Sequence, residues 1–367
     1  MIRGRDDTPG AGRWSLRRWA DTLGPLLALL LIILGFAAAH QIKAGLDERR
    51  FALQRAAREG RPPAEVPGRW AFIRAQENRL LTLRTFRSTA NQTVSVGIAA
   101  VGMTLVIIGG GIDLSVGSVM ALAGVTTAWC LLQGWPPVAA AAAGVSIGGA
   151  CGLINALMIT RLKVVPFIGT LGMWGIARGL AKGIAGEQKI DAPAGWLGRY
   201  VVVSQPEPAW LIVSPGVWTM LLLAVLAWLV LRCTALGRHI FAVGSSESAA
   251  RLCGIRVERV KLILYAVAGL CTGLAGVMQF CRLNVGDPTT AMGAELDVIA
   301  SVVIGGGSLA GGEGSVTGTL VGALIMAFLR VGCDHVGVPS WVQEMIIGAV
   351  IVLAVALDHL RRRTAET

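Results

Sequence analysis

The acid Asp113 lies between two apolar runs and shortly follows a glycine triplet at 109–111. Ser115 directly precedes the second apolar run, 116–132. Glycine triplets are unfavourable inside a helix, and a carboxylate at the depth of the hydrocarbon is costly. Both are tolerated where a spanning helix is interrupted and its irregular backbone lines a cavity or is buried in protein. The pattern predicts a broken helix at membrane depth, with Ser115 as N-cap of the second run and Asp113 near its positive end.

A second interruption is expected at 164–173, which reads Val-Val-Pro-Phe-Ile-Gly-Thr-Leu-Gly-Met. Pro166, Gly169 and Gly172 punctuate this apolar stretch. Proline and glycine at such positions are typical of the discontinuous helices that form binding sites in transporters. We therefore predict a second re-entrant or broken element here.

The composition indicates an integral membrane protein. The chain has 367 residues, of which 54% are hydrophobic and 48 are glycine, and its mean hydropathy is +0.65. The apolar runs predict an all-α polytopic fold with roughly eight to ten transmembrane helices, some of them broken. The net charge of +11 is carried between these runs, which favours cytoplasmic loops beside anionic lipid over nucleic-acid binding.

Enzymatic and metal chemistry have no pattern to support them. The sequence lacks a Walker-type Gly-Lys-Ser/Thr loop, a G-x-S-x-G elbow and an H-E-x-x-H pair, and its seven cysteines include no C-x-x-C. We therefore expect neither catalytic residues nor a metal site, and no cofactor bound to this chain.

A basic loop at 233–261 carries a short helix with its own capping signals. Ser246 can cap a helix that starts at the acid Glu247 and runs to about Cys253, and Gly254 can end it. A short, rigid helix between two spans suits docking to a partner. The residues alone favour an amphipathic surface helix without a partner.

Three blocks of sequence carry a resemblance to a known family. Residues 110–118 read Gly-Gly-Ile-Asp-Leu-Ser-Val-Gly-Ser, and a second block at 282–297 leads into a glycine-rich stretch at 302–318. These blocks and the 237–261 loop resemble the permease subunits of bacterial ribose/xylose/galactose-type ABC importers, in the expected order. The resemblance extends from about Thr89 to Leu357.

The resemblance implies an organisation of the chain. Residues 1–22 would be a basic cytoplasmic tail, and 23–88 a first span followed by a charged segment that is longer than in the family. A transmembrane permease domain would occupy 89–360 and include the 233–261 coupling loop. A short C-terminal tail, 361–367, would follow.

The resemblance also implies the partners and the working parts. We expect a multi-pass protein of the bacterial inner membrane, paired with a second permease copy or a paralogue. Separate ATPase subunits would bind ATP and Mg²⁺, and a periplasmic binding protein would deliver a monosaccharide or sugar-like solute. The expected ATPase-coupling residues are Glu247, Ala249, Ala250, Arg251, Leu252 and Gly254. The translocation-path candidates are Gly109, Gly110, Gly111, Asp113, Ser115, Pro166, Phe167 and Thr170.

Two alternatives stay open at this point. Asp113 either contacts the solute or only fixes the broken helix. A stand-alone ion-coupled secondary transporter or channel would use Asp113 for coupling, because intramembrane acids often serve ion pathways. The identity of the transported solute does not follow from the sequence.

Overall fold

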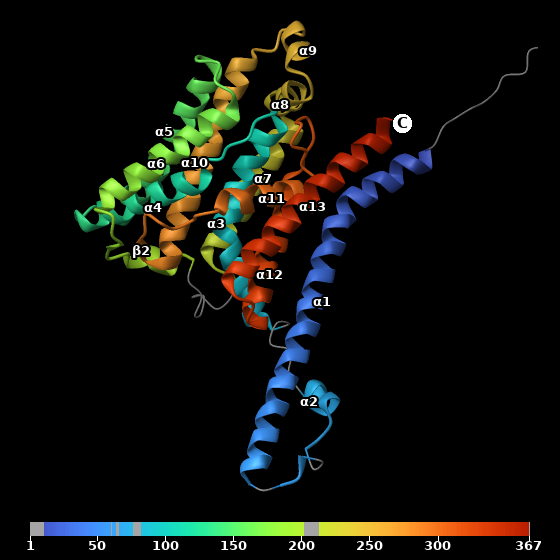
Figure 1. Ribbon diagram of the computed structural model, residues 1–367. Coiled ribbons are helices and arrows are strands. Elements are labelled where there is room, and N and C mark those ends of the chain that lie inside the picture. The colour runs from blue at the N-terminus through green and yellow to red at the C-terminus, as the bar shows by residue number, and fades with distance from the viewer. Residues whose placement is uncertain (1–10, 60, 64–65, 76–81, 202–212, 367) are drawn as a thin grey trace, which may run out of the picture.

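The computed structural model describes residues 11–59, 61–63, 66–75, 82–201 and 213–366. Within these ranges the chain is almost entirely helical, as the sequence predicted (Figure 1). The one sheet is a pair of two-residue strands, in which β1 (Ile190–Asp191) pairs antiparallel with β2 (Val285–Gly286). The other elements in chain order are α1 (Ala11–Arg58), α2 (Arg69–Ala75), α3 (Leu83–Ile108), α4 (Val116–Leu132), α5 (Pro137–Thr160), α6 (Pro166–Ala185), η3 (Gly195–Arg199), α7 (Pro215–Cys233), α8 (Ala235–Ser245), α9 (Glu247–Leu252), α10 (Val257–Leu283), α11 (Ala294–Ile304), α12 (Val316–Val336) and α13 (Ser340–Glu366).

Six described helices are long and apolar enough to cross a membrane: α1, α3, α5, α7, α10 and α12. Two shorter apolar helices, α4 and the stretch 340–356 of α13, accompany them. The polytopic all-α architecture predicted from the sequence is therefore present in the described part of the chain.

The helix α3 forms the centre of the bundle. It is the most deeply buried of the candidate spans, and it lies between α7, α10, α11 and α12 (Figure 1). On one side, α5 packs on α10 through glycines. A Cβ on Gly148 would meet the backbone of Gly273, and a Cβ on Gly269 would meet that of Gly152. Small residues permit such close approach in membrane bundles, where van der Waals contact drives association.

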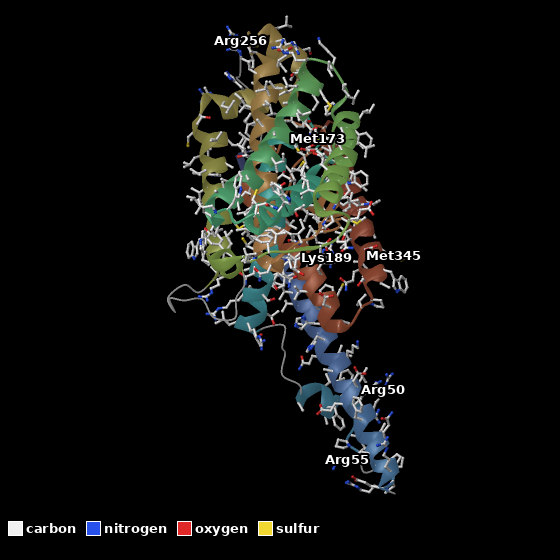
Figure 2. The ribbon with its side chains drawn as sticks, turned by 90° about the vertical axis from the view of Figure 1, so that its left-hand side faces the viewer. Arg50, Arg55, Met173, Lys189, Arg256 and Met345 are labelled. Atoms are coloured by element: carbon white, nitrogen blue, oxygen red, sulfur yellow. The ribbon has the colours of Figure 1, made fainter. Side chains whose placement is uncertain are left out.

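The first span and much of the charged segment form one long helix, and the short helix α2 follows it. The helix α1 begins inside the predicted basic tail and continues to Arg58, in the charged segment, while residues 1–10 of the tail lie outside the described residues. Figure 2 shows Arg50 and Arg55 at one end of the molecule and Arg256, beside α9, at the other. The charged half of α1 and the short helix of the basic loop are thus at opposite ends.

The expected interruption at 164–173 is wrong. Residues 166–185 form the continuous helix α6, in which Pro166 is the first residue and Gly169 and Gly172 are interior positions. Proline at the first helical position is favoured because its missing N–H would have no intrahelical acceptor there. The proline therefore starts a helix instead of breaking one.

Candidate functional site

The break between α3 and α4 is present as predicted. Gly109 is the C-cap of α3, and Gly110 follows with a φ of +77°, a left-handed conformation that favours glycine. A Cβ on Gly111 would collide with the hydroxyl of Tyr265 on α10. The triplet thus allows both the sharp change of direction and the close approach of α10.

A buried polar cluster fixes the chain after the triplet. Asp113, Ser115 and Asn155 are each at most 3% exposed. The Oδ1 of Asp113 accepts hydrogen bonds from the backbone N–H of Ser115 at 2.8 Å and from its Oγ at 2.6 Å. Asn155 on α5 donates from Nδ2 to the same Oγ at 3.0 Å. The carboxylate that the sequence singled out therefore fastens the break to α4 and α5.

The predicted capping role of the Ser115 side chain is wrong. Ser115 occupies the N-cap position of α4, but its side chain makes no capping hydrogen bond there. Its backbone is in the right-handed helical region, and its hydroxyl donates to Asp113 instead. Its oxygen accepts from the Nδ2 of Asn155 rather than from a backbone N–H of α4.

Two further helices hold the same segment. Thr170 on α6 is fully buried, and its Oγ1 accepts a hydrogen bond from the backbone N–H of Leu114 at 3.2 Å. That hydroxyl donates to the carbonyl oxygen of Pro166 at 2.9 Å. On α10, the hydroxyl of Tyr265 donates to the carbonyl of Ile112 at 3.5 Å. The side chain of Phe167 is 51% exposed. Of the path candidates, the structure thus brings Asp113, Ser115, Thr170 and the Pro166 carbonyl into one region.

The break also meets the basic loop, at a contact that we call the glycine junction: Gly110, Gly244, Gly311 and Gly312. Gly244 lies in the last turn of α8, and the other two glycines lie between α11 and α12. The backbone N–H of Gly312 donates to the carbonyl of Ile108 at 2.8 Å. A Cβ on Gly311 would lie 2.7 Å from the Gly244 oxygen and 2.9 Å from the Gly110 Cα. Three chain segments therefore meet backbone to backbone.

The short helix α9 follows the junction directly and is capped as predicted. The Oγ of Ser246 accepts a hydrogen bond from the backbone N–H of Ala249 at 3.3 Å, and Gly254 ends the helix with a φ of +79°. Ala250 is buried, whereas Leu252 is 90% exposed. The side chain of Leu252 is therefore free to contact a partner.

An ion-pair network braces α9. Glu247 accepts hydrogen bonds from Arg251 at 2.9 Å and from Lys261 at 2.6 Å, and Arg251 also pairs with Glu258 at 2.5 Å. The hydrogen bond from Lys261, followed by that from Arg251, holds the pKa of Glu247 below its ordinary value. The network joins α9 to the first turns of α10 and so limits its tilt.

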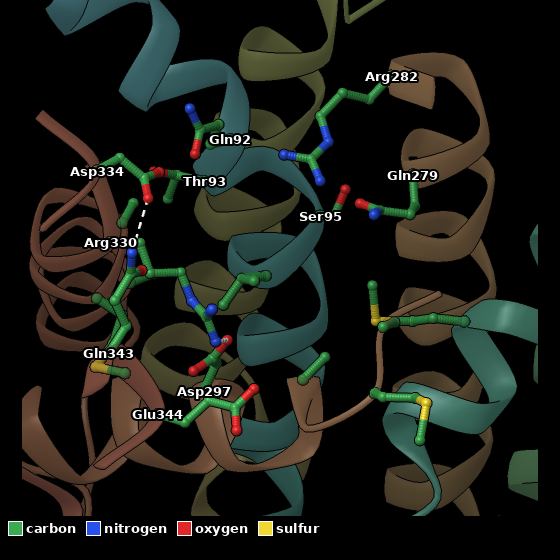
Figure 3. A pocket seen from close by; sticks show the side chains of 18 of the residues that line it. Gln92, Thr93, Ser95, Gln279, Arg282, Asp297, Arg330, Asp334, Gln343 and Glu344 are labelled. Atoms are coloured by element: carbon green, nitrogen blue, oxygen red, sulfur yellow. Dashed lines mark hydrogen bonds and ion pairs between the residues drawn. The ribbon is translucent and has the colours of Figure 1, made fainter. Parts of the chain in front are cut away.

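A polar cavity of about 400 Å³ lies among α3, α10, α11, α12 and α13, and Met120 in the first turns of α4 also lines it (Figure 3). Asp297 lies in the first turn of α11, a common position for an acid, and that position alone is no reason to single it out. In the structure, Asp297 accepts a hydrogen bond from the Nη2 of Arg330 at 2.6 Å, inside this cavity. Two opposite charges within apolar helices were the signal that could have suggested this pairing.

The comparisons with known proteins agree with this architecture. The model of the family described as "Branched-chain amino acid transport system / permease component" matches residues 86–355. The chain belongs to this family. As a member, it is a multi-pass membrane protein, and its six apolar helices fit that assignment.

Members of the family among characterised proteins are transport permeases by name. The chain is 38% identical over 299 residues to the ribose import permease protein RbsC of Escherichia coli (strain K12), covering 80% of this chain and 91% of that protein. It is 41% identical to RbsC of Bacillus subtilis (strain 168) over 268 residues, which cover 72% and 81% of the two chains. It is 34% identical to the xylose transport system permease protein XylH of Escherichia coli (strain K12) over 349 residues, covering 80% and 89%. No solved structure matched the chain.

Proposed function

We propose that the chain is the membrane-spanning permease subunit of an ABC importer that moves a monosaccharide or sugar-like solute across a bacterial inner membrane. The observation that carries this proposal is the 38% identity to a ribose import permease over 91% of that protein's length. In this proposal, ATP and Mg²⁺ are bound and ATP is hydrolysed by separate ATPase subunits. A periplasmic binding protein delivers the solute, and a second permease copy or paralogue completes the channel.

The helix α9 is the element we assign to ATPase docking. The side chain of Leu252 is exposed on this helix. The ion pairs of Glu247 with Arg251 and Lys261 hold the helix in place. Only Ser246 separates α9 from α8, whose last residue is Ser245. Movement of α9 would therefore displace Gly244 and, through it, the glycine junction. Backbone contacts transmit a displacement more directly than flexible side chains, because they leave no rotamer to absorb it.

The break itself would line part of the path through the exposed backbone at Gly110. Alternating access would then displace a segment held by Asp113, Ser115 and Thr170. If Asp113→Asn and Gly110→Leu both left uptake unchanged, a role for residues 109–118 in the path would be wrong.

Isolation of the tagged chain from native membranes in mild detergent, with mass spectrometry of co-purifying proteins, tests the proposal. We expect an ATPase with a Walker motif, which is lost with Leu252→Asp. The matched control is Phe51→Asp, since Phe51 is 71% exposed and directly follows Arg50, which Figure 2 shows at the end of the molecule opposite to Arg256. If the chain came out alone and carried solute into liposomes in response to an ion gradient without ATP, it would be a stand-alone secondary transporter.

A further inference from the structure

The polar cavity beside α3 has unsatisfied hydrogen-bonding groups on its inner wall. Ser95 on α3 is 3% exposed and Asp297 on α11 is 6% exposed, and both line the cavity. The Oγ of Ser95, the Oδ1 of Asp297 and the Nε of Arg282 are buried without a hydrogen-bond partner among the described residues. Buried polar groups are rarely left unpaired, so three in one cavity point to a polar occupant.

The charges in the cavity favour a neutral occupant. Arg330 pairs with the Oδ2 of Asp297 at 2.6 Å, which leaves Oδ1 as an acceptor. Arg282 approaches from the opposite wall (Figure 3), and its Nε is a free donor. An anion would face the carboxylates of Asp297, Asp334 and Glu344, and a cation would face two guanidinium groups.

The remaining polar side chains are amides and hydroxyls. Gln92, Gln279 and Gln343 lie on three different helices that line the cavity, together with Thr93 and Ser95. Amides and hydroxyls both donate and accept hydrogen bonds, as do the hydroxyl groups of a polyol or sugar. A cavity of about 400 Å³ is within the usual range for small-molecule sites.

The cavity runs along the buried face of α3 and reaches the first turns of α4, where Met120 lines it. Ser95 lies about 20 Å along α3 from Ile108, at 1.5 Å per residue. The rim of the cavity includes the exposed residues Asp334, Ser340 and Glu344, around the turn between α12 and α13. The cavity therefore leads from the surface to the buried wall of α3, on the side away from α9.

We propose that this cavity is a binding site for a neutral polyhydroxylated solute, with Ser95, Asp297 and Arg282 as its hydrogen-bonding groups. The inference rests on the proposed function, because it places the transported sugar in this chain. It assigns the first contact of the solute with the permease to the cavity, ahead of the break at 109–118.

Protection of an engineered cysteine tests the site without requiring transport. Ser340→Cys places a thiol on the rim, in a background where the exposed Cys233 and Cys253 are changed to serine. Purified protein is labelled with a small water-soluble thiosulfonate reagent in the presence of D-ribose, D-xylose, L-arabinose or D-fructose, and with sodium chloride of equal osmolarity as a control. We expect at least one sugar to slow labelling in a saturable way.

Matched variants then locate the binding groups. Ser95→Ala should raise the sugar concentration for half-protection roughly threefold to tenfold, the effect of one lost hydrogen bond. Thr93→Val should act in the same direction. Thr127→Val is the control, because Thr93 and Thr127 are both buried and both donate to a backbone carbonyl at 2.8 Å, but only Thr93 lines the cavity.

The outcomes separate this inference from the proposed function. Saturable protection that Ser95→Ala weakens and Thr127→Val leaves unchanged supports the site, even if no ATPase co-purifies. If no sugar slows the labelling, the cavity holds only water. That result overturns the inference, even if an ATPase is recovered. Protection that Ser95→Ala and Thr93→Val leave unchanged also overturns it, because the sugar then binds elsewhere.

Discussion

The carbonyl oxygen of Ile108, at the end of α3, accepts a 2.8 Å hydrogen bond from the backbone N–H of Gly312. Gly312 lies in the connection between α11 and α12, more than two hundred positions later in the chain. This bond satisfies one of the carbonyls that a helix leaves unpaired at its C-terminus. The broken helix is therefore completed by a distant segment of the fold rather than by its own continuation.

Gly244→Ala should disturb this junction. The added methyl group would collide with the carbonyl oxygen of Ile108 and lie 2.6 Å from the nitrogen of Gly312. Backbone atoms cannot rotate away, so we expect α8 to shift and stability to fall by about 1–3 kcal/mol, as for other overpacked sites. ATP-driven uptake should fall further than stability alone explains, because α8 leads into α9. Thermal unfolding in detergent and uptake in proteoliposomes measure the two effects.

Gly183→Ala is the matched control for this substitution. Gly183 lies inside α6, and a Cβ there would meet no described atom within 4 Å. Alanine should raise stability slightly, since it is a better helix former than glycine. Equal losses of uptake in the two variants would show that the glycine junction has no part in transport.

Asp113→Ala and Asp113→Asn distinguish the carboxylate's charge from its hydrogen bonds. Alanine removes the acceptor of both bonds from Ser115, and we expect a loss of about 2–6 kcal/mol, because each buried donor left without an acceptor costs about 1–3 kcal/mol. Asparagine keeps one oxygen in the same place and should lose roughly half as much. Thermal unfolding of the two variants gives the comparison. If asparagine cost as much as alanine, the negative charge itself would be the stabilising feature.

The broken helix and the short capped helix could be predicted because their signals are local. Gly110 needs a left-handed backbone, and Ser246 and Gly254 delimit α9 by their own chemistry. The continuous helix α6 could not be told from a broken one by its glycines. Pro166 is tolerated at the first helical position and disruptive further in, so its effect depends on where the helix begins.

The cavity could not be predicted because its groups come from helices far apart in the chain. Ser95 and Asp297 read separately as a polar residue in an apolar run and as a first-turn acid. Only packing brings them into one cavity, together with Arg330 and Arg282. The same holds for the path candidates, since the sequence placed Asp113 and Thr170 in separate elements and packing joined them to one segment. Their role in translocation stays a prediction.

Arg178→Met should destabilise the connection between β2 and α11. Arg178 on α6 is buried, and its Nη1 donates to the carbonyl oxygens of Pro288 at 2.7 Å and Thr290 at 2.9 Å. Methionine fills similar space but donates nothing, so both carbonyls lose a charged partner. We expect a loss of about 3 kcal/mol, measured by thermal unfolding. Lys182→Met, at an exposed position of the same helix, should cost less than about 1 kcal/mol. Equal effects would mean that helix charge matters and the two contacts do not.

The ion pairs around Glu247 predict how α9 responds to acid. Because the hydrogen bonds from Lys261 and Arg251 lower the pKa of Glu247 from its ordinary value of 4.5, the stabilisation is complete above pH 4.5. It is lost as the pH falls through the lower pKa of the folded protein. A fluorophore on the exposed Cys253, with Cys233 changed to serine, reports the mobility of α9 by anisotropy. We expect constant anisotropy from pH 7 to pH 5 and a fall below pH 4.5.

Glu247→Gln isolates the cause of that acid transition. Without the carboxylate, the bridges to Arg251 and Lys261 are absent at every pH. Anisotropy should then be lower at pH 7 and should fall less in acid, because only the pair of Arg251 with Glu258 remains to be broken. High salt should reduce the difference in anisotropy between the unsubstituted protein and Glu247→Gln, because the ion pairs are partly exposed and salt screens them. Glu187→Gln, which changes an exposed acid remote from α9 in sequence, should leave the acid transition in place. An unchanged transition in Glu247→Gln would show that another group unlocks α9.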